Sequence, residues 1–150
     1  MILNLVVLES SHVMKSLHTI ISGSFAIIAV WLVIRSARGI ALGKSYLTLD
    51  KYLSYGFIIT LYLQLIFGLI LFANPSVSGN ESAGMEGALK LASKRFWPIE
   101  HIVLMLFALL IANLGLIFSN SSSIDKDKHR KVLVYYMIAL IMIAVSLSAN

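Results

Sequence analysis

The 150-residue chain is 59% hydrophobic and 13% charged, with a formal net charge of +5 and no cysteine. About 25% of a typical soluble domain is charged, so this composition excludes an ordinary water-soluble fold. The lack of cysteine excludes disulfides, zinc–thiolate sites, iron–sulfur clusters and thiol catalysis within this chain. Its basic residues form short clusters between apolar runs, which indicates membrane topology signals and argues against nucleic acid as a partner.

Four apolar runs cover most of the chain, at about 13–34, 52–73, 96–118 and 132–149. Each has 18 to 23 residues, enough at about 1.5 Å per residue to cross a hydrocarbon core about 30 Å thick. Backbone polar groups must be satisfied within lipid, so each run is expected to be helical. A buried soluble bundle would need polar faces that these runs lack. The sequence therefore predicts one all-α domain over 1–150, an integral membrane up-down four-helix bundle.

The basic residues are divided unequally between the two ends of this bundle. One end carries four of them, and the other carries eight, namely Arg35, Arg38, Lys44, Lys51, Lys126, Lys128, Arg130 and Lys131. The positive-inside rule makes the second end cytoplasmic, with both termini on the outer (periplasmic) side of a bacterial inner membrane. Residues 1–10 have no Lys or Arg, so a cleaved signal peptide is not expected.

The connection at 74–95 lies on the outer side in this topology. Met85, Leu89 and Ala92 recur at helical spacing, which predicts a short helix on the membrane surface. Aromatic residues at the span ends are expected at headgroup depth; these are Trp31, Tyr52, Trp97, Tyr135 and Tyr136.

Two histidines lie about one turn inside the first and third spans. A charge at the centre of a membrane helix costs on the order of 2.5–3.5 kcal/mol, so ionisable residues there indicate function. His18 and His101 are expected at one depth, because the first and third helices run parallel. Ser22 and Met105 lie four residues further along the same helix faces. Two imidazoles at one depth on different helices are what axial ligation of a b-type haem requires.

The surroundings of the pair fit a flat cofactor. Arg95 and Trp97 lie just outside the third span, where haem propionates would emerge and need cations. Thr19 or Glu100 is a candidate acceptor for the second N–H of an imidazole. The faces around the histidines hold small residues that leave room for a ring, among them Ala29, Ala108, Ala112 and Gly115.

Other interpretations of the polar residues stay open. Either histidine could instead hydrogen-bond a neighbouring helix or lie hydrated at the interface. His12, before the first span, and His129, in the basic loop at 125–131, are expected to be solvated. Gln64 is typical of a packing seam with an interhelical hydrogen bond, running through Gly56, Thr60 and Gly68. A contact to a quinone or to a cofactor edge is the alternative for Gln64.

Three stretches carry a resemblance to a known family. These are the apolar run at 63–71 (LQLIFGLIL), Arg95-Phe96 followed by Glu100-His101, and the basic KHRK run at 128–131. They resemble small four-helix membrane proteins of Bacteroidetes-type bacteria, often labelled cytochrome b-like. The resemblance implies an inner-membrane, haem-binding protein, with His18 and His101 matching the family's histidines in the first and third helices.

The chain departs from that family at two positions. Tyr62 and Leu116 stand where the family has histidines. If the family holds two cofactors, this chain could keep at most the outer one, between His18 and His101.

We expect a haem b protein, or a small subunit of a respiratory or redox membrane complex, that passes electrons near the outer face. No nucleophile motif, paired carboxylate or phosphate loop is present, so a self-contained enzyme is not expected. The alternative is a cofactor-free accessory subunit that packs on a larger complex through the Gly56–Gly68 seam and the Ala108, Ala112 and Gly115 face. A weaker alternative is metal or quinone handling by His18, His101 and Met105.

Overall fold

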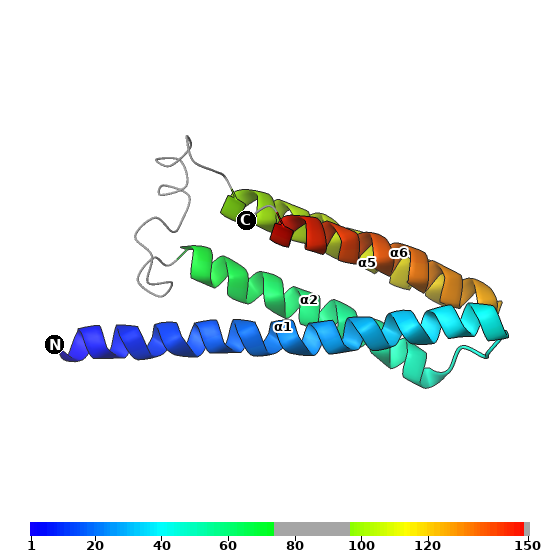
Figure 1. The fold of residues 1–150 in the computed structure, drawn as a ribbon, viewed down its shortest axis with the longest axis horizontal. Coiled ribbons are helices and arrows are strands. Elements are labelled where there is room, and N and C mark those ends of the chain that lie inside the picture. Colours follow the sequence, from blue (N-terminus) through cyan, green and yellow to red (C-terminus); the bar gives the residue numbers. More distant parts are fainter. Residues whose placement is uncertain (74–96, 149–150) are drawn as a thin grey trace.

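The computed structural model describes residues 1–73 and 97–148, which form four long helices (Figure 1). They are α1 (Ile2–Leu42), α2 (Thr48–Ala73), α5 (Trp97–Asn120) and α6 (Asp125–Ser148). All four are long and apolar enough to cross a membrane. The predicted all-α four-helix bundle is confirmed, and the chain is a multi-pass membrane protein by the length and composition of these helices. The predicted connection and surface helix at 74–95 lie outside the described residues.

The helices alternate in direction along the bundle (Figure 1). α1 packs against α2 and α6, and α5 packs against α6 and α2. α1 and α5 therefore occupy opposite corners. The starts of α1 and α5 and the ends of α2 and α6 lie at one end of the bundle, which we call the His18 end. The connections at 43–47 and 121–124 lie at the other, the His129 end.

The helices extend beyond the predicted apolar runs, and α1 and α6 extend furthest. α1 begins at Ile2 rather than near 13 and has 41 residues, about 60 Å at 1.5 Å per residue, or twice the thickness of a hydrocarbon core. It ends at Gly43, whose φ of 62° is the left-handed conformation that glycine adopts easily. α6 begins at Asp125 rather than 132, so the predicted loop at 125–131 is wrong. Hydropathy indicates which residues lie in the hydrocarbon core of the membrane, but a helix can continue beyond the core until a helix-breaking residue ends it.

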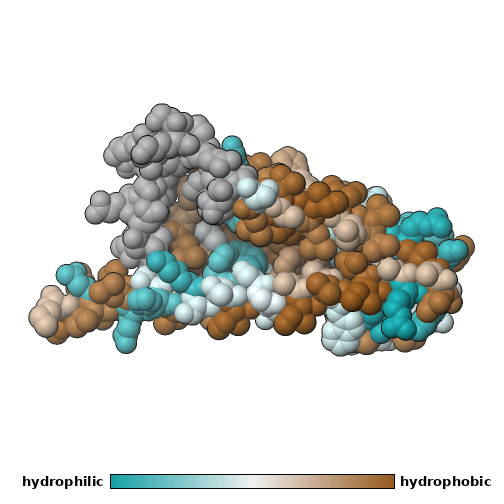
Figure 2. Space-filling model, viewed as in Figure 1, coloured by the Kyte–Doolittle hydropathy of each residue, from teal (hydrophilic) through white to brown (hydrophobic). Residues whose placement is uncertain are grey.

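The core is narrow, and most large apolar side chains face outward. Phe57 and Tyr136 are fully buried and stack with ring centroids 4.5 Å apart. Tyr136 also donates its hydroxyl proton to the carbonyl oxygen of Ser54, at 3.3 Å, so its ring belongs to the core and does not face lipid. The outer surface is largely hydrophobic, with hydrophilic residues at the His129 end and along the first half of α1 (Figure 2). An apolar exterior of this kind is suited to lipid.

The small-residue surfaces that the sequence offered to a partner complex are used within the chain. Ala108 and Ala112 are fully buried. A Cβ on Gly115 would lie 2.5 Å from the Cβ of Tyr135, so α5 and α6 touch at this glycine. On α2, a Cβ on Gly56 would contact Ile28 of α1. The face of Ala108, Ala112 and Gly115 is buried within the bundle and is not open to a partner. The Gly56–Gly68 seam is half-exposed, and its binding of a partner stays a prediction.

Candidate functional site

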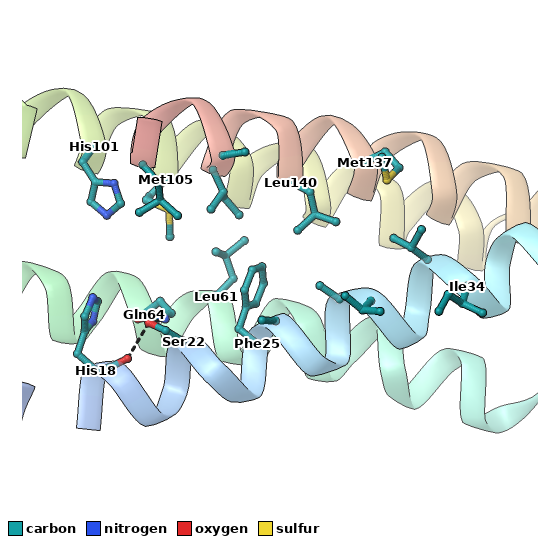
Figure 3. Close-up of a pocket in the computed structure, with 17 residues that line it drawn as sticks. His18, Ser22, Phe25, Ile34, Leu61, Gln64, His101, Met105, Met137 and Leu140 are labelled. Carbon is teal, nitrogen blue, oxygen red and sulfur yellow. Dashed lines mark hydrogen bonds between the residues drawn. The ribbon is translucent and has the colours of Figure 1, made fainter. Parts of the chain in front are cut away.

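His18 and His101 line one cavity of about 530 Å³. They enter it from α1 and α5, the opposite corners of the bundle, and their rings point toward the space between these helices (Figure 3). The volume lies within the range of about 300–1,000 Å³ that is usual for small-molecule and cofactor sites. The predicted pairing of the two histidines is therefore present as a shared cavity.

The cavity is mostly apolar and extends along α1 toward the His129 end. Its walls come from all four described helices, and every lining residue other than the two histidines, Ser22 and Gln64 is hydrophobic. Phe25 and Leu61 lie between the histidines and the far end, which Ile34 and Met137 line (Figure 3). The polar groups are thus concentrated at the His18 end. Apolar walls lower the local dielectric and so strengthen the electrostatic interactions of the polar groups beside them.

Ser146 of α6 orients His101. Its Oγ lies 3.0 Å from the Nδ1 of His101 and donates its own proton to the carbonyl oxygen of Ile143, at 2.7 Å. Because that proton is engaged, the serine oxygen accepts from an Nδ1–H. This geometry favours the Nδ1-protonated tautomer of His101, in which Nε2 is the basic nitrogen.

Thr19 and Glu100 were the predicted orienting groups, and Ser146 was not among them. Both are exposed, and the Thr19 hydroxyl donates to the Lys15 carbonyl oxygen in its own helix. Ser146 lies 45 residues after His101, but antiparallel packing of α5 and α6 returns the end of α6 to the start of α5. A polar residue in the last turn of the fourth span was the signal that could have found it.

Ser22 and Gln64 flank His18. The Ser22 hydroxyl donates to the carbonyl oxygen of His18 at 2.8 Å, and Nε2 of Gln64 donates to the Ser22 oxygen. The interhelical hydrogen bond predicted for Gln64 is confirmed, and it places this amide at the candidate site. A Cβ on Gly68 would lie 3.9 Å from Cε1 of His18, so the imidazole lies directly against α2.

The other predicted site residues have different outcomes. Met105 is nearly buried and lines the cavity beside His101. Arg95 lies outside the described residues, and so does the side chain of Trp97, which begins α5. Of the small residues expected around the ring, Ala29 lines the cavity, whereas Ala108, Ala112 and Gly115 do not. The room beside His101 therefore comes from helix spacing and not from those three residues.

The two remaining histidines differ. His12 is exposed, as predicted. His129 was expected to be solvated and is instead 1% exposed. Its ring packs on the backbone of Gly39, its Nε2 lies 3.4 Å from the carbonyl oxygen of Ser45, and Tyr46 meets it edge-on at 5.0 Å. Asp125 starts a helix, and this helix carries His129 inward between α1 and the 43–47 connection.

Among residues 1–73 and 97–148, no group of three or more His, Cys, Asp or Glu side chains could hold a metal ion. Fold and site together define a multi-pass membrane four-helix bundle with two histidines facing one apolar cavity. Comparison of the chain with protein-family models, curated proteins and solved structures gives no match.

Proposed function

We propose that this protein binds a b-type haem between His18 and His101 and passes electrons as a small subunit of a respiratory or redox complex. The observation that carries the proposal is the cavity, which receives one imidazole from each of two opposite helices within apolar walls. Two protein ligands suffice when a macrocycle supplies the other four. A bare metal ion would need a larger ligand set than the described residues provide.

The roles of the chain's residues follow from their contacts. The two histidines would supply Nε2 atoms to the iron, and Ser146 fixes the tautomer and orientation of His101. Phe25, Leu61 and Met105 would pack on the macrocycle and exclude water. When bound, the haem supplies reversible one-electron transfer, and the protein sets its potential through ligands, hydrogen bonds and burial.

An optical spectrum tests the proposal. The wild-type protein, purified from haem-replete cells, should have a Soret band and a reduced α-band, and both should be lost in His18→Ala and in His101→Ala. His12→Ala is the matched control, because this histidine is on the same helix but exposed, and it should keep the spectrum. A colourless wild-type protein that gains no Soret band on titration with haemin would contradict the proposal.

The proposed orientation has both termini in the periplasm and the basic connections in the cytoplasm of a bacterial inner membrane. It is supported by the eight basic residues at the His129 end. The natural chain has no cysteine, so single-cysteine variants report position cleanly. In intact spheroplasts a membrane-impermeant maleimide should label Ser10→Cys and not Ser123→Cys. The reverse pattern would invert the topology.

A cofactor-free accessory subunit is the second candidate. The start of α1 favours it, because this segment projects beyond the other helices (Figure 1) and carries exposed apolar side chains, namely Ile2, Leu3, Leu5, Val6 and Leu8. Such a surface fits a partner helix or lipid. Native electrophoresis of mildly solubilised membranes separates the candidates. A colourless chain that migrates within a larger complex and loses this association when residues 2–8 are removed would favour the accessory role.

A further inference from the structure

Two polar atoms beside the cavity have no hydrogen-bond partner among the described residues, and their chemistry is complementary. They are Nδ1 of His18 and Oε1 of Gln64. A neutral imidazole has one N–H donor, and an amide oxygen is an acceptor. Gln64 is 7% exposed, so its unpaired oxygen costs free energy until it finds a donor.

The orientation of the Gln64 amide follows from its neighbour. Ser22 donates its hydroxyl proton to the carbonyl oxygen of His18, which leaves the serine oxygen as an acceptor toward α2. The Gln64 atom that meets it must therefore be the donor, Nε2. Oε1 of Gln64 is therefore able to accept a hydrogen bond from another donor at the cavity wall.

The His18 ring lies on the part of α2 that carries Gln64. Gly68 is one turn after Gln64 on the same helix face, and a Cβ there would lie 3.9 Å from Cε1 of His18. With no side chain at Gly68, the ring rests against α2 and can turn in the adjoining cavity. His18 and Gln64 both line that cavity (Figure 3).

We propose that Gln64 is the positioning residue for His18, with its Oε1 accepting the Nδ1–H of the imidazole. His18 then takes the tautomer that Ser146 imposes on His101, and both rings present Nε2 to the same cavity. A histidine ligand usually donates its other N–H to an oxygen acceptor, which fixes the ring and raises its basicity. That Nε2 of His18 would bind haem iron rests on the proposed function. The hydrogen bond between His18 and Gln64 does not depend on haem.

The test uses ¹⁵N-histidine-labelled full-length protein in micelles, without haem, and reads the tautomer of His18 by NMR. The resonances of His18 are identified by their loss in His18→Ala. Wild type should show a protonated Nδ1 whose hydrogen exchanges slowly with water. Gln64→Leu should lose this slow exchange and the preference for the Nδ1–H tautomer. Thr60→Val is the matched control, because the Thr60 hydroxyl bonds within α2, to the Gly56 and Phe57 carbonyls, and it should match wild type.

A second measurement applies to haem-loaded protein. Gln64→Glu should lower the midpoint potential relative to wild type, because a carboxylate makes the ligating imidazole more electron-donating, and Gln64→Leu should raise it. A wild-type His18 protonated at Nε2, or a tautomer unchanged by Gln64→Leu, overturns the role of Gln64. If wild type binds no haem, the proposed function fails, and the tautomer measurement still decides the hydrogen bond.

Discussion

The two ends of the bundle each hold a histidine whose Nδ1 has no partner among the described residues. The surroundings of the two imidazole rings differ. At the His129 end the ring is 1% exposed and fills the space over Gly39, where a Cβ would lie 2.5 Å from ring atoms. At the His18 end the ring is half-buried and faces a cavity of about 530 Å³. The same residue type is a packing element at one end and an accessible group at the other.

The two ends also differ in charge, because the His129 end contains an ion pair between Arg35 and Asp50. Asp50, in the first turn of α2, accepts hydrogen bonds from Nε and Nη2 of Arg35 at 2.7 and 3.2 Å. Its Oδ2 also accepts the backbone N–H of Leu47 at 2.8 Å, which satisfies an orphan donor at the start of the helix. The His129 end thus holds an ion pair with a buried carboxylate and a capped helix start, although Nδ1 of His129 and Oγ of Ser119 have no partner among the described residues. The polar atoms of the His18 end line the cavity. Substitutions at the His129 end should therefore change the free energy of unfolding most, and substitutions at the His18 end should change ligand binding most.

The largest expected effect is the loss of the Asp50 carboxylate. Asp50→Ala should lower the free energy of unfolding in micelles by about 3 kcal/mol, because it leaves the half-buried Arg35 guanidinium and the Leu47 N–H without their acceptor. Asp127→Ala is the control, since its pair with Arg130 is exposed and 3.8 Å long, and exposed pairs contribute about 0–1 kcal/mol. Equal costs for the two variants would remove the distinction between the ends.

Ligand binding should stabilise the protein through the His18 end and should not depend on the packing at the His129 end. Haemin at 100 times its dissociation constant should stabilise the wild-type protein by about 2.7 kcal/mol. His18→Ala should abolish this gain, whereas Gly39→Ala, at the opposite end, should keep it. Thermal unfolding with and without haemin measures both. A gain that survives His18→Ala would place the binding site elsewhere.

Glycine-to-alanine substitutions on α1 should have opposite effects on stability at the two ends of the bundle. Gly39→Ala must push the His129 ring aside, and overpacking costs about 1–3 kcal/mol. A Cβ on Gly23, in the His18 half of the same helix, meets nothing within 4 Å, so Gly23→Ala should stabilise through helix propensity by about 0.5–1 kcal/mol. The two variants should therefore differ by about 2 kcal/mol in unfolding free energy. Adding His129→Ala to Gly39→Ala should recover part of the loss.

The smallest effect is expected at the hydrogen bond beside the cavity. Ser22→Ala removes the acceptor of Gln64 Nε2, and interhelical hydrogen bonds in membranes contribute about 0.6 kcal/mol on average. Unfolding of this variant should be close to that of wild type, while its haem spectrum should broaden because the amide is no longer fixed. A loss above about 2 kcal/mol would show that the His18 end is also structural.

Much of the fold could be predicted from hydropathy, because four runs of membrane-spanning length leave few alternatives. The helix ends could not. Residues 2–12 and 125–131 are helical although they lie outside the apolar runs, because helix propensity acts independently of hydropathy. At the site, His18, Ser22, His101 and Met105 were found from depth and helical spacing. Ser146 was missed because only the antiparallel contact between α5 and α6 brings it to His101.

The lipid environment, the number of helices and the up-down order follow from the sequence alone, because they depend on the length and apolarity of each run. The sequence also places two histidines near one depth. Tertiary structure decided which histidine is buried for packing and which faces a cavity, because this depends on the rotation of each helix and on close contacts at single glycines. Gly39 brings α1 against His129, and Gly68 lets His18 lie on α2 beside Gln64.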